Sequence, residues 1–207
     1  MTPSCRIAAD IGTDHGMLGC ELLTSGKCEY VWFTDISEPS LAKARTRAES
    51  LGLTDRAAFY LGDGALALPG RPDTAIIAGM GGNTIVHILS CGLSILRGSI
   101  LVLGANTALF ALRKWLCENA YSITDERAVS EAGRHYVLIR TQLGKSSYTW
   151  EELTAGPVLI NKTDTQTREY FAFRCGCAKT ALDGASKSSD ADITCLKKEW
   201  ELWRSLI

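Results

Sequence analysis

Short apolar runs alternate with longer segments of helical period between residues 6 and 141 of the 207-residue chain. This alternation is typical of βα units on a parallel sheet. Each run ends at or near Gly or Asp and is apolar enough to be covered on both faces. Five strands are predicted first, at Arg6–Ile11, Tyr30–Thr34, Ala57–Leu61, Thr74–Ala78 and Ile100–Leu103. The rhythm therefore predicts an α/β fold with loops at the carboxyl ends of its strands.

The alternation of short apolar runs and helical segments ends after the fifth strand and the helix that follows it. Tyr121–Val129 and His135–Thr141 are predicted as two strands joined by a tight turn at residues 131–134. A terminal antiparallel hairpin on a mostly parallel sheet separates a methyltransferase-type sheet from a dehydrogenase-type one. The pattern thus favours the former.

From about Trp150 the pattern becomes helical, with a capping box at Thr163–Gln166 and a loop at Gly184–Asp190. The last apolar stripe recurs at steps of three and four, at Ile193, Leu196, Trp200, Trp203 and Ile207. We predict two parts, an α/β domain at residues 1–145 and an appended helical hairpin at residues 146–207.

Two helix starts are predicted within the α/β part. Ser37 is expected to cap the second helix, with Pro39 in its first turn. Asn106 or Thr107 is expected to cap the helix after the fifth strand, although Asn106 could instead reach a methyl acceptor.

Charge limits the classes of partner. The chain has 22 Lys and Arg against 23 Asp and Glu, and 46% of its residues are hydrophobic. This composition suits a globular protein and excludes both long disorder and a protein that is basic overall. A nucleic acid would have to be held by local groups of cations, such as Lys43, Arg45 and Arg47 or Arg113, Lys114, Arg134 and Arg140.

The eight cysteines form no C-x-x-C pair, and Cys175, Cys177 and Cys195 offer only three thiolates. We therefore expect buried, reduced thiols and no metal site. The chain opens without a charged segment ahead of an apolar one, and it has no run of about 18 apolar residues. A cytoplasmic protein with no secretory signal and no membrane span is expected.

The first predicted strand ends in Asp10-Ile-Gly12-Thr-Asp14-His-Gly16, a glycine-containing turn with an acid inside it. Glycines at such a turn let a ligand approach the backbone. Asp14 would repel a pyrophosphate but attract the amino group or sulfonium of S-adenosylmethionine (SAM). The turn therefore favours a methyl donor over NAD.

Acids also follow the next two strands. Asp35 lies where α/β folds place an acid that accepts hydrogen bonds from ribose hydroxyls, although it could simply begin a turn ahead of Ser37. Asp63 stands between two glycines at the end of the third strand, within reach of an adenine amino group. Acids at three successive strand ends together favour a cationic ligand that carries a nucleoside.

Three glycines in four residues follow the fourth strand, in Ile77-Ala-Gly79-Met-Gly81-Gly82. They leave room for a flat group against the backbone, which is where a target base or other acceptor would lie, although a sharp turn without a ligand has the same composition.

With these motifs, the sequence resembles the bacterial tRNA (adenine-N1)-methyltransferases of the TrmK type, a family of class I SAM-dependent methyltransferases with a Rossmann-like sheet. The resemblance rests on Ala9–His15, Gly62–Gly64 and, most specifically, Ile77–Gly82. It covers about residues 5 to 145, and the helical tail occupies the place of the coiled-coil appendage of the family.

The resemblance implies SAM as cofactor and N1 of a tRNA adenine as acceptor, with the base unpaired and extruded into the site. By this resemblance, the methionine end of SAM would be lined by Asp10, Gly12, Asp14 and His15. Asp35 would hold the ribose and Asp63 the adenine, and Ala78 to Gly81 would adjoin the methyl transfer site. The expected cofactor-binding residues are Asp10, Gly12, Asp14, His15, Asp35, Ile36, Asp63, Gly64, Ala78, Gly79, Met80 and Gly81. Asp14 and Asn106 are the expected catalytic residues. Asp14 would stabilise charge on the base or accept a hydrogen bond from its exocyclic amine, and Asn106 would help to orient the base.

The chain departs from the family at two places. A Gln-Pro-Asn motif is replaced by Gly104-Ala105-Asn106, and the chain begins almost at its first strand, where the family has a helix. Two alternatives follow, a SAM-binding protein that has lost catalysis and a small-molecule methyltransferase whose tail covers the pocket. A nicotinamide dehydrogenase is the least favoured reading.

Overall fold

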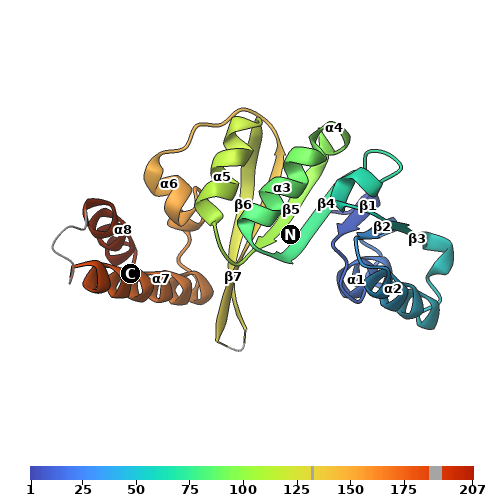
Figure 1. Ribbon diagram of the computed structural model, residues 1–207, viewed down its shortest axis with the longest axis horizontal. Coiled ribbons are helices and arrows are strands. Elements are labelled where there is room, and N and C mark those ends of the chain that lie inside the picture. The colour runs from blue at the N-terminus through green and yellow to red at the C-terminus, as the bar shows by residue number, and fades with distance from the viewer. Residues whose placement is uncertain (132, 187–192) are drawn as a thin grey trace.

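The computed structural model describes residues 1–131, 133–186 and 193–207. A seven-stranded sheet in the order β3-β2-β1-β4-β5-β7-β6 forms its centre (Figure 1). The strands are β1 (Cys5–Ile11), β2 (Cys28–Asp35), β3 (Ala57–Leu61), β4 (Thr74–Met80), β5 (Ile100–Ala105), β6 (Tyr121–Glu131) and β7 (Arg134–Leu143). The strands β1 to β5 are mutually parallel, whereas β7 is antiparallel to β5 and β6. The predicted fold class is therefore confirmed, although residue 132 of the predicted turn lies outside the described residues.

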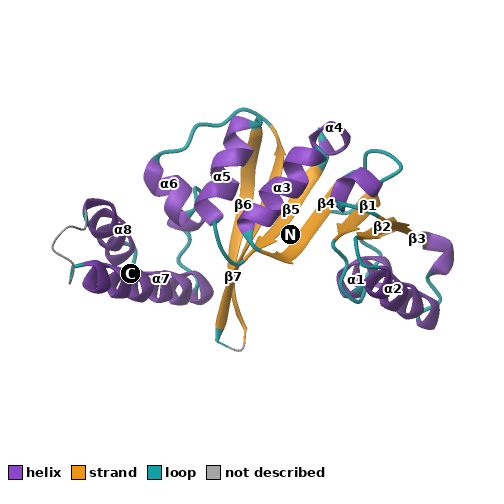
Figure 2. Ribbon diagram, in the orientation of Figure 1, coloured by secondary structure: helices purple, strands orange, loops and turns teal. Residues whose placement is uncertain are grey.

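Helices cover both faces of the sheet (Figure 2). They are α1 (Met17–Thr24), α2 (Glu38–Ser50), α3 (Gly82–Cys91), α4 (Leu93–Leu96), α5 (Leu109–Glu118), α6 (Trp150–Ala155), α7 (Thr165–Ala185) and α8 (Thr194–Ser205). Single 3-10 turns are η1 (Thr54–Arg56), η2 (Gly64–Ala67) and η3 (Leu159–Asn161). One hydrophobic core lies between the sheet and α1 and α2, and the other lies under α3 and α5 and continues into the C-terminal helices. No described helix combines the length and the hydropathy of a membrane span.

The predicted caps of the α/β part have different outcomes. Ser37 caps α2 as predicted, since its side chain accepts a hydrogen bond from Ser40 N at 3.4 Å. The prediction for α5 is wrong, because Ala108 occupies the N-cap position with a left-handed backbone and no side chain caps the helix. Asn106 and Thr107 are thereby displaced into the loop that follows β5.

The predicted capping box ahead of α7 is also wrong. The side chain of Asp164 caps this helix by accepting a hydrogen bond from Thr167 N at 3.1 Å. Asp164 has this role because it lies one position nearer than Thr163 to the first turn of α7. Gln166 points elsewhere and accepts a hydrogen bond from Ser130 N of β6 at 3.2 Å. The helix α7 continues to Ala185, so the predicted loop starts later, and residues 187–190 of it lie outside the described part.

The C-terminal segment is more than the hairpin that the pattern predicts. The helix α6 and the turn η3 come first, and α7 and α8 then pack on each other. Trp203 of α8 is fully buried against Tyr170 and Phe171 of α7. Trp203 of the predicted stripe therefore lies in the core, whereas Ile207 at its end is exposed. The division at residue 145 stays a prediction.

The cysteines are all free among the described residues, but the expectation that they are buried holds only for Cys20 and Cys28. Three others, Cys5, Cys117 and Cys175, are half-buried, and Cys91, Cys177 and Cys195 are exposed. The described residues contain no cluster of His, Cys, Asp and Glu that could hold a metal ion.

A buried ion pair joins the sheet to the C-terminal segment. Arg113 of α5 and Glu126 of β6 are both inaccessible to solvent, and Arg113 Nε donates to Glu126 Oε1 at 2.8 Å. Arg113 also donates to the carbonyls of Leu153 and Thr154 of α6 at 3.0 and 2.9 Å. The expectation that Arg113 belongs to a surface group of cations is therefore wrong.

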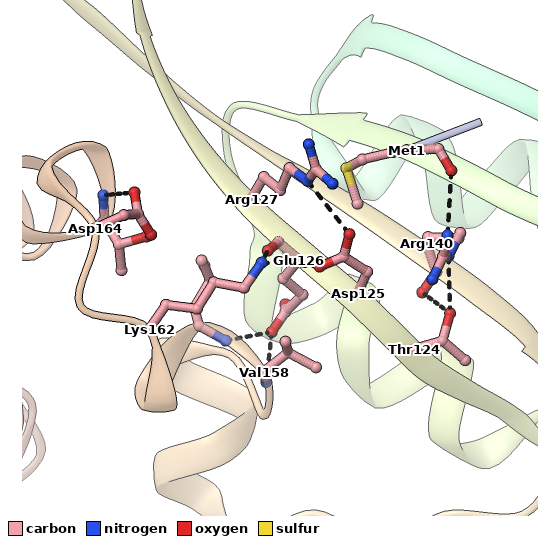
Figure 3. A network of polar contacts seen from close by, with 11 residues as sticks. Met1, Thr124, Asp125, Glu126, Arg127, Arg140, Val158, Lys162 and Asp164 are labelled. Carbon is pink, nitrogen blue, oxygen red and sulfur yellow. Dashed lines mark hydrogen bonds and ion pairs between the residues drawn. The ribbon is translucent and has the colours of Figure 1, made fainter. Parts of the chain in front are cut away.

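The other carboxylate oxygen of Glu126 completes the junction (Figure 3). It accepts from the backbone N of Val158 and Leu159 at 2.9 and 3.2 Å. Lys162 donates to Asp125 at 2.8 Å and to the carbonyl of Glu126. The Glu126 carboxylate thus accepts hydrogen bonds from a helix side chain and from the chain entering η3 at the same time.

The stability of the fold should depend strongly on this pair. Arg113→Met leaves Glu126 buried without its cation, so we expect a loss of about 3 to 5 kcal/mol in the free energy of unfolding. Lys114→Met removes the next cation of α5, whose side chain is 58% exposed and pairs with Glu118, and should change the free energy of unfolding by less than about 1 kcal/mol. Urea unfolding of the two variants measures the difference. Equal, small losses would contradict the assignment.

Candidate functional site

The carboxyl ends of the five parallel strands meet at one edge of the sheet. In spatial order, β3, β2, β1, β4 and β5 end there at Leu61, Asp35, Ile11, Met80 and Ala105. The chain winds outward from β1 to β3 and then returns to β4, so the strand order reverses between β1 and β4. Open α/β sheets bind ligands in the crevice at such a reversal.

Asp10 lies at the base of this crevice. Its side chain is 6% exposed, and its Oδ2 accepts from Thr13 Oγ1 at 2.8 Å and from Gly19 N at 3.1 Å. Burial raises the pKa of Asp10 to about 6, and the charge of Asp35 adds to the rise, whereas the two hydrogen bonds lower it. Asp10 therefore holds the turn between β1 and α1 in shape.

Asp14 and His15 lie at the surface of the turn between β1 and α1. Asp14 Oδ1 lies 3.2 Å from His15 Nε2, and their side chains are 75% and 48% exposed. The backbone of His15 is left-handed, and its carbonyl accepts from Arg47 Nε of α2 at 3.0 Å. Asp14 is therefore presented to solvent at the edge, next to a cavity of about 520 Å³ that His15 and α2 border.

Asp35, at the end of β2, has one carboxylate oxygen in a hydrogen bond within the protein. Asp35 Oδ1 accepts from Ser37 N at 2.8 Å, which matches the alternative that it begins a turn. No hydrogen bond within the described chain engages its Oδ2, so the two readings of Asp35 are compatible. Ile36 follows with 75% of its surface exposed, and such an apolar side chain fits a wall for a flat base.

The third strand is tied to the second at this edge, because Gly62 N donates to the Asp35 carbonyl at 3.0 Å. Asp63 is exposed, and its carboxylate has no hydrogen-bond partner in the described chain. Gly64 is buried against Ile88 of α3 and has a positive φ of 53°, so its position serves packing. The two neighbours thus differ, since only Asp63 faces solvent.

The carboxyl end of β4 is open, although the strand continues to Met80, two residues beyond its predicted end. Gly79 has a φ of +77°, it interrupts the pairing of β4 with β5, and nothing lies within 4 Å of where its side chain would be. Its glycine is therefore required by the backbone conformation, and the space above it is free. Met80 packs on Gly12, where a methyl group would overlap the Met80 side chain. This contact brings the turns after β1 and β4 together, and Ala78 and Gly81 flank it.

The loop after β5 closes the edge. Thr107 contacts the turn after β4, because its carbonyl accepts from Gly82 N at 2.9 Å. Asn106 is exposed and caps nothing, and it has no hydrogen-bond partner in the described chain. A side chain at Gly104 would lie 3.0 Å from Ala78 Cβ and 3.2 Å from Leu138, which limits its size there.

All the predicted residues thus lie at or just after the carboxyl ends of the parallel strands, at one edge of the sheet, and contacts link these strand ends from β3 to β5. Asp10, Gly12 and Gly64 act mainly inside the fold, whereas Asp14, Ile36, Asp63, Gly79 and Asn106 are open to solvent. Sequence reasoning missed the support that Thr13 and Arg47 give to this turn. Thr13, three residues after Asp10, was a detectable signal, but the contact of Arg47 with His15 spans 32 residues and had none.

The comparisons with known proteins agree with this arrangement. A family model described as "Methyltransferase domain" matches residues 1–139. The tRNA (adenine(22)-N(1))-methyltransferase of Bacillus subtilis is 32% identical over 158 residues, which are 74% of this chain and 66% of that enzyme. The chain therefore spans slightly less than two thirds of this relative in the match.

Solved structures extend the similarity to the tail. The B. subtilis M1A22 tRNA methyltransferase TrmK superposes with a TM-score of 0.89 at 25% identity, covering 100% of this chain and 94% of that one. M. capricolum TrmK, solved with S-adenosyl-homocysteine (SAH), superposes with a TM-score of 0.84 at 21% identity, covering 99% and 92%. The likeness of fold includes the C-terminal helices.

Asp10 should make stability depend on pH. Its pKa rises from 3.8 when unfolded to about 6 when folded, so the folded state binds this proton more tightly. The resulting stabilisation is complete below about pH 4 and is lost as the pH rises through about 6, a change of about 3 kcal/mol. Urea unfolding at several pH values should show this loss in the wild type relative to Asp10→Asn, which keeps an acceptor for Thr13. Parallel pH curves for the two proteins would rule out the raised pKa.

Proposed function

The chain belongs to the methyltransferase family, and within it to the tRNA (adenine-N1)-methyltransferases of the TrmK type, and from this membership we propose that it transfers a methyl group from SAM to N1 of adenine 22 in tRNA. One observation carries the proposal. Solvent-facing acids and an open glycine turn share the edge of the sheet where the strand order reverses. Such an edge suits a nucleoside that carries positive charge beside a flat acceptor.

The residues of the edge fit SAM better than a pyrophosphate cofactor. Asp10, Asp14, Asp35 and Asp63 all lie there, and Arg47, the cation nearest the first turn, is engaged by the His15 carbonyl. We propose that the acids of the first turn face the methionine amino group, that the free oxygen of Asp35 accepts from ribose hydroxyls, and that Asp63 accepts from the adenine amino group. Ile36 would cover one face of that adenine.

The reaction asks little acid–base chemistry of the protein. When bound, SAM supplies a methyl group on a positively charged sulfur, and the bond to sulfur breaks with its electrons kept on sulfur as the bond to N1 forms. N1 already carries a lone pair, so no base is needed to activate it. The protein must position the ring and stabilise the positive charge that the ring acquires.

Two residues have the placement for these tasks. Gly79 leaves free space above the turn after β4, into which a flat ring fits against the backbone. Asp14 is an exposed carboxylate on the turn that Met80 joins to this space, so we propose that it stabilises the charge on the methylated base. Asn106, which has no structural hydrogen bond to lose, would orient the base by its amide.

We further propose that residues 1–145 form the SAM-binding domain and that residues 146–207 assist tRNA binding in the cytoplasm. Because the net charge of the chain is −1, tRNA binding would have to depend on local groups of cations. Lys43 and Arg45 are exposed on α2, and Lys43 lines the cavity at His15, which favours this surface for phosphates. Arg113 takes no part, because it is buried.

The proposal predicts methylation of one base. The protein, supplied with SAM carrying a labelled methyl group, should label a tRNA transcript with adenine 22, and the digest should contain 1-methyladenosine. An otherwise identical transcript with guanine 22 should fall to background. SAH binding without any labelled nucleoside would instead favour a protein that has lost catalysis, which the Gly104-Ala105 departure motivates. Label that appears only in small molecules of a cell extract would favour the small-molecule alternative.

Asn106 should affect the chemical step and not cofactor binding. In Asn106→Ala we expect kcat to fall about 10- to 100-fold, the effect of one hydrogen bond to a group that becomes charged, with unchanged SAH affinity. Asn161→Ala, at an exposed asparagine of η3 far along the chain, is the control and should keep wild-type kcat. Steady-state kinetics and calorimetry measure the two quantities. A loss of SAH affinity with unchanged kcat would place Asn106 at the cofactor instead.

A further inference from the structure

The β6–β7 hairpin extends past the edge that holds the site (Figure 1). The last pair between β5 and β7 is Ala105 with Val137. Beyond it, β6 and β7 continue with Tyr136, His135 and Arg134 of β7 opposite residues 129–131 of β6. The hairpin therefore overhangs the carboxyl edge beside the loop of Asn106.

A cavity of about 340 Å³ lies between this overhang, the loop after β5 and helix α7. Asn106 and Thr107 form one wall, and His135, Tyr170, Phe173 and Arg174 form others. This volume is at the small end for ligand sites, which suits a single base and not a whole cofactor.

Two aromatic rings meet in the cavity. The rings of His135 and Phe173 are stacked, with centroids 4.3 Å apart and planes at 26°. Ser130 Oγ lies 2.7 Å from His135 Nδ1 and fixes the imidazole from the neighbouring strand. Phe173 nevertheless stays 45% exposed, so core packing does not explain a phenylalanine at this position.

The cavity selects a neutral flat group over a free phosphate. Arg174, the cation of its wall, is engaged by Glu199 at 2.9 Å and lies 4.9 Å over the ring of Trp203. What the cavity offers is an aromatic surface with a fixed imidazole behind it. Unpaired bases of RNA are recognised by stacking on such surfaces.

The cavity also lies next to the methyl transfer site. Thr107 takes a hydrogen bond from Gly82 N on one side of the loop, while the same loop forms the cavity wall on the other. A single-stranded segment whose adenine enters the turn at Gly79 would thus carry its neighbouring base across this loop.

On the basis of the proposed function, we infer that the cavity binds the RNA base adjacent in sequence to the methylated adenine, by stacking it on Phe173 with His135 as the support. The pair thereby positions the RNA strand and makes the enzyme sensitive to whether that neighbour is unpaired. Arg134, exposed on the overhang before His135, is available to the phosphates of the same segment.

Substitutions of Phe173 test this inference. Phe173→Ala should lower kcat/KM for tRNA about 5- to 150-fold, the range of one stacked base, and should leave SAH affinity unchanged. Phe173→Leu keeps apolar bulk without an aromatic face and should behave like Phe173→Ala, whereas Phe173→Trp should stay within about threefold of wild type. The matched control is Phe110→Ala on α5, a phenylalanine that is 38% exposed and lies outside this cavity. It should keep wild-type kcat/KM.

A binding measurement separates this inference from the proposed function. 2-Aminopurine at nucleotide 21 or 23 of the transcript, bound to the protein with SAH, should be quenched at one of the two positions, and the quenching should disappear in Phe173→Ala. A wild-type protein that forms 1-methyladenosine while Phe173→Ala or Phe173→Leu keeps full kcat/KM and full quenching would overturn the inference alone. A wild-type protein that methylates no tRNA would overturn the proposed function.

Discussion

The buried pair of Arg113 and Glu126 is the interaction on which the rest of the arrangement depends. Two charges without solvent are tolerable only when hydrogen bonds offset most of the desolvation, and here Glu126 accepts from α5 and from the chain entering η3. Arg113 donates through Nε and Nη1 to Glu126 and to α6, and its Nη2 is left without a hydrogen-bond partner in the described chain. The pair therefore fixes the C-terminal segment against β6. Since α7 follows directly, the wall that it gives to the cavity beside Asn106 depends on the same pair.

The sheet was predictable because its signals are local. Parallel strands covered on both faces must be short, apolar and closed by turn residues, so each strand could be recognised within about ten residues of sequence. Arg113 could not be interpreted in this way. Its partner lies on a strand 13 residues later and its other acceptors about 40 residues later, so the sequence shows only a basic residue near Lys114.

The candidate site was predictable to the same extent and for the same reason. Acids and glycines at strand ends share one edge whenever the strands are parallel, whatever the details of the loops. What those residues do locally was not visible. Asn106 or Thr107 was expected to cap α5, with Asn106 alternatively reaching the acceptor, but Ala108 occupies the N-cap position and Asn106 has no hydrogen-bond partner in the described chain. The stack of His135 on Phe173 joins a strand and a helix 38 residues apart, and no pattern in either segment indicates it.

These contacts bear on what the net charge of −1 implies for binding to RNA. A protein that is not basic overall gains little from long-range attraction to RNA, and burial of Arg113 removes one of its few clustered cations. Under the proposed function, RNA recognition would depend more on shape and stacking, which salt weakens much less than it weakens ion pairs. An aromatic surface beside the proposed methyl transfer site would serve such recognition, because a base extruded from a tRNA leaves its neighbour unstacked as well.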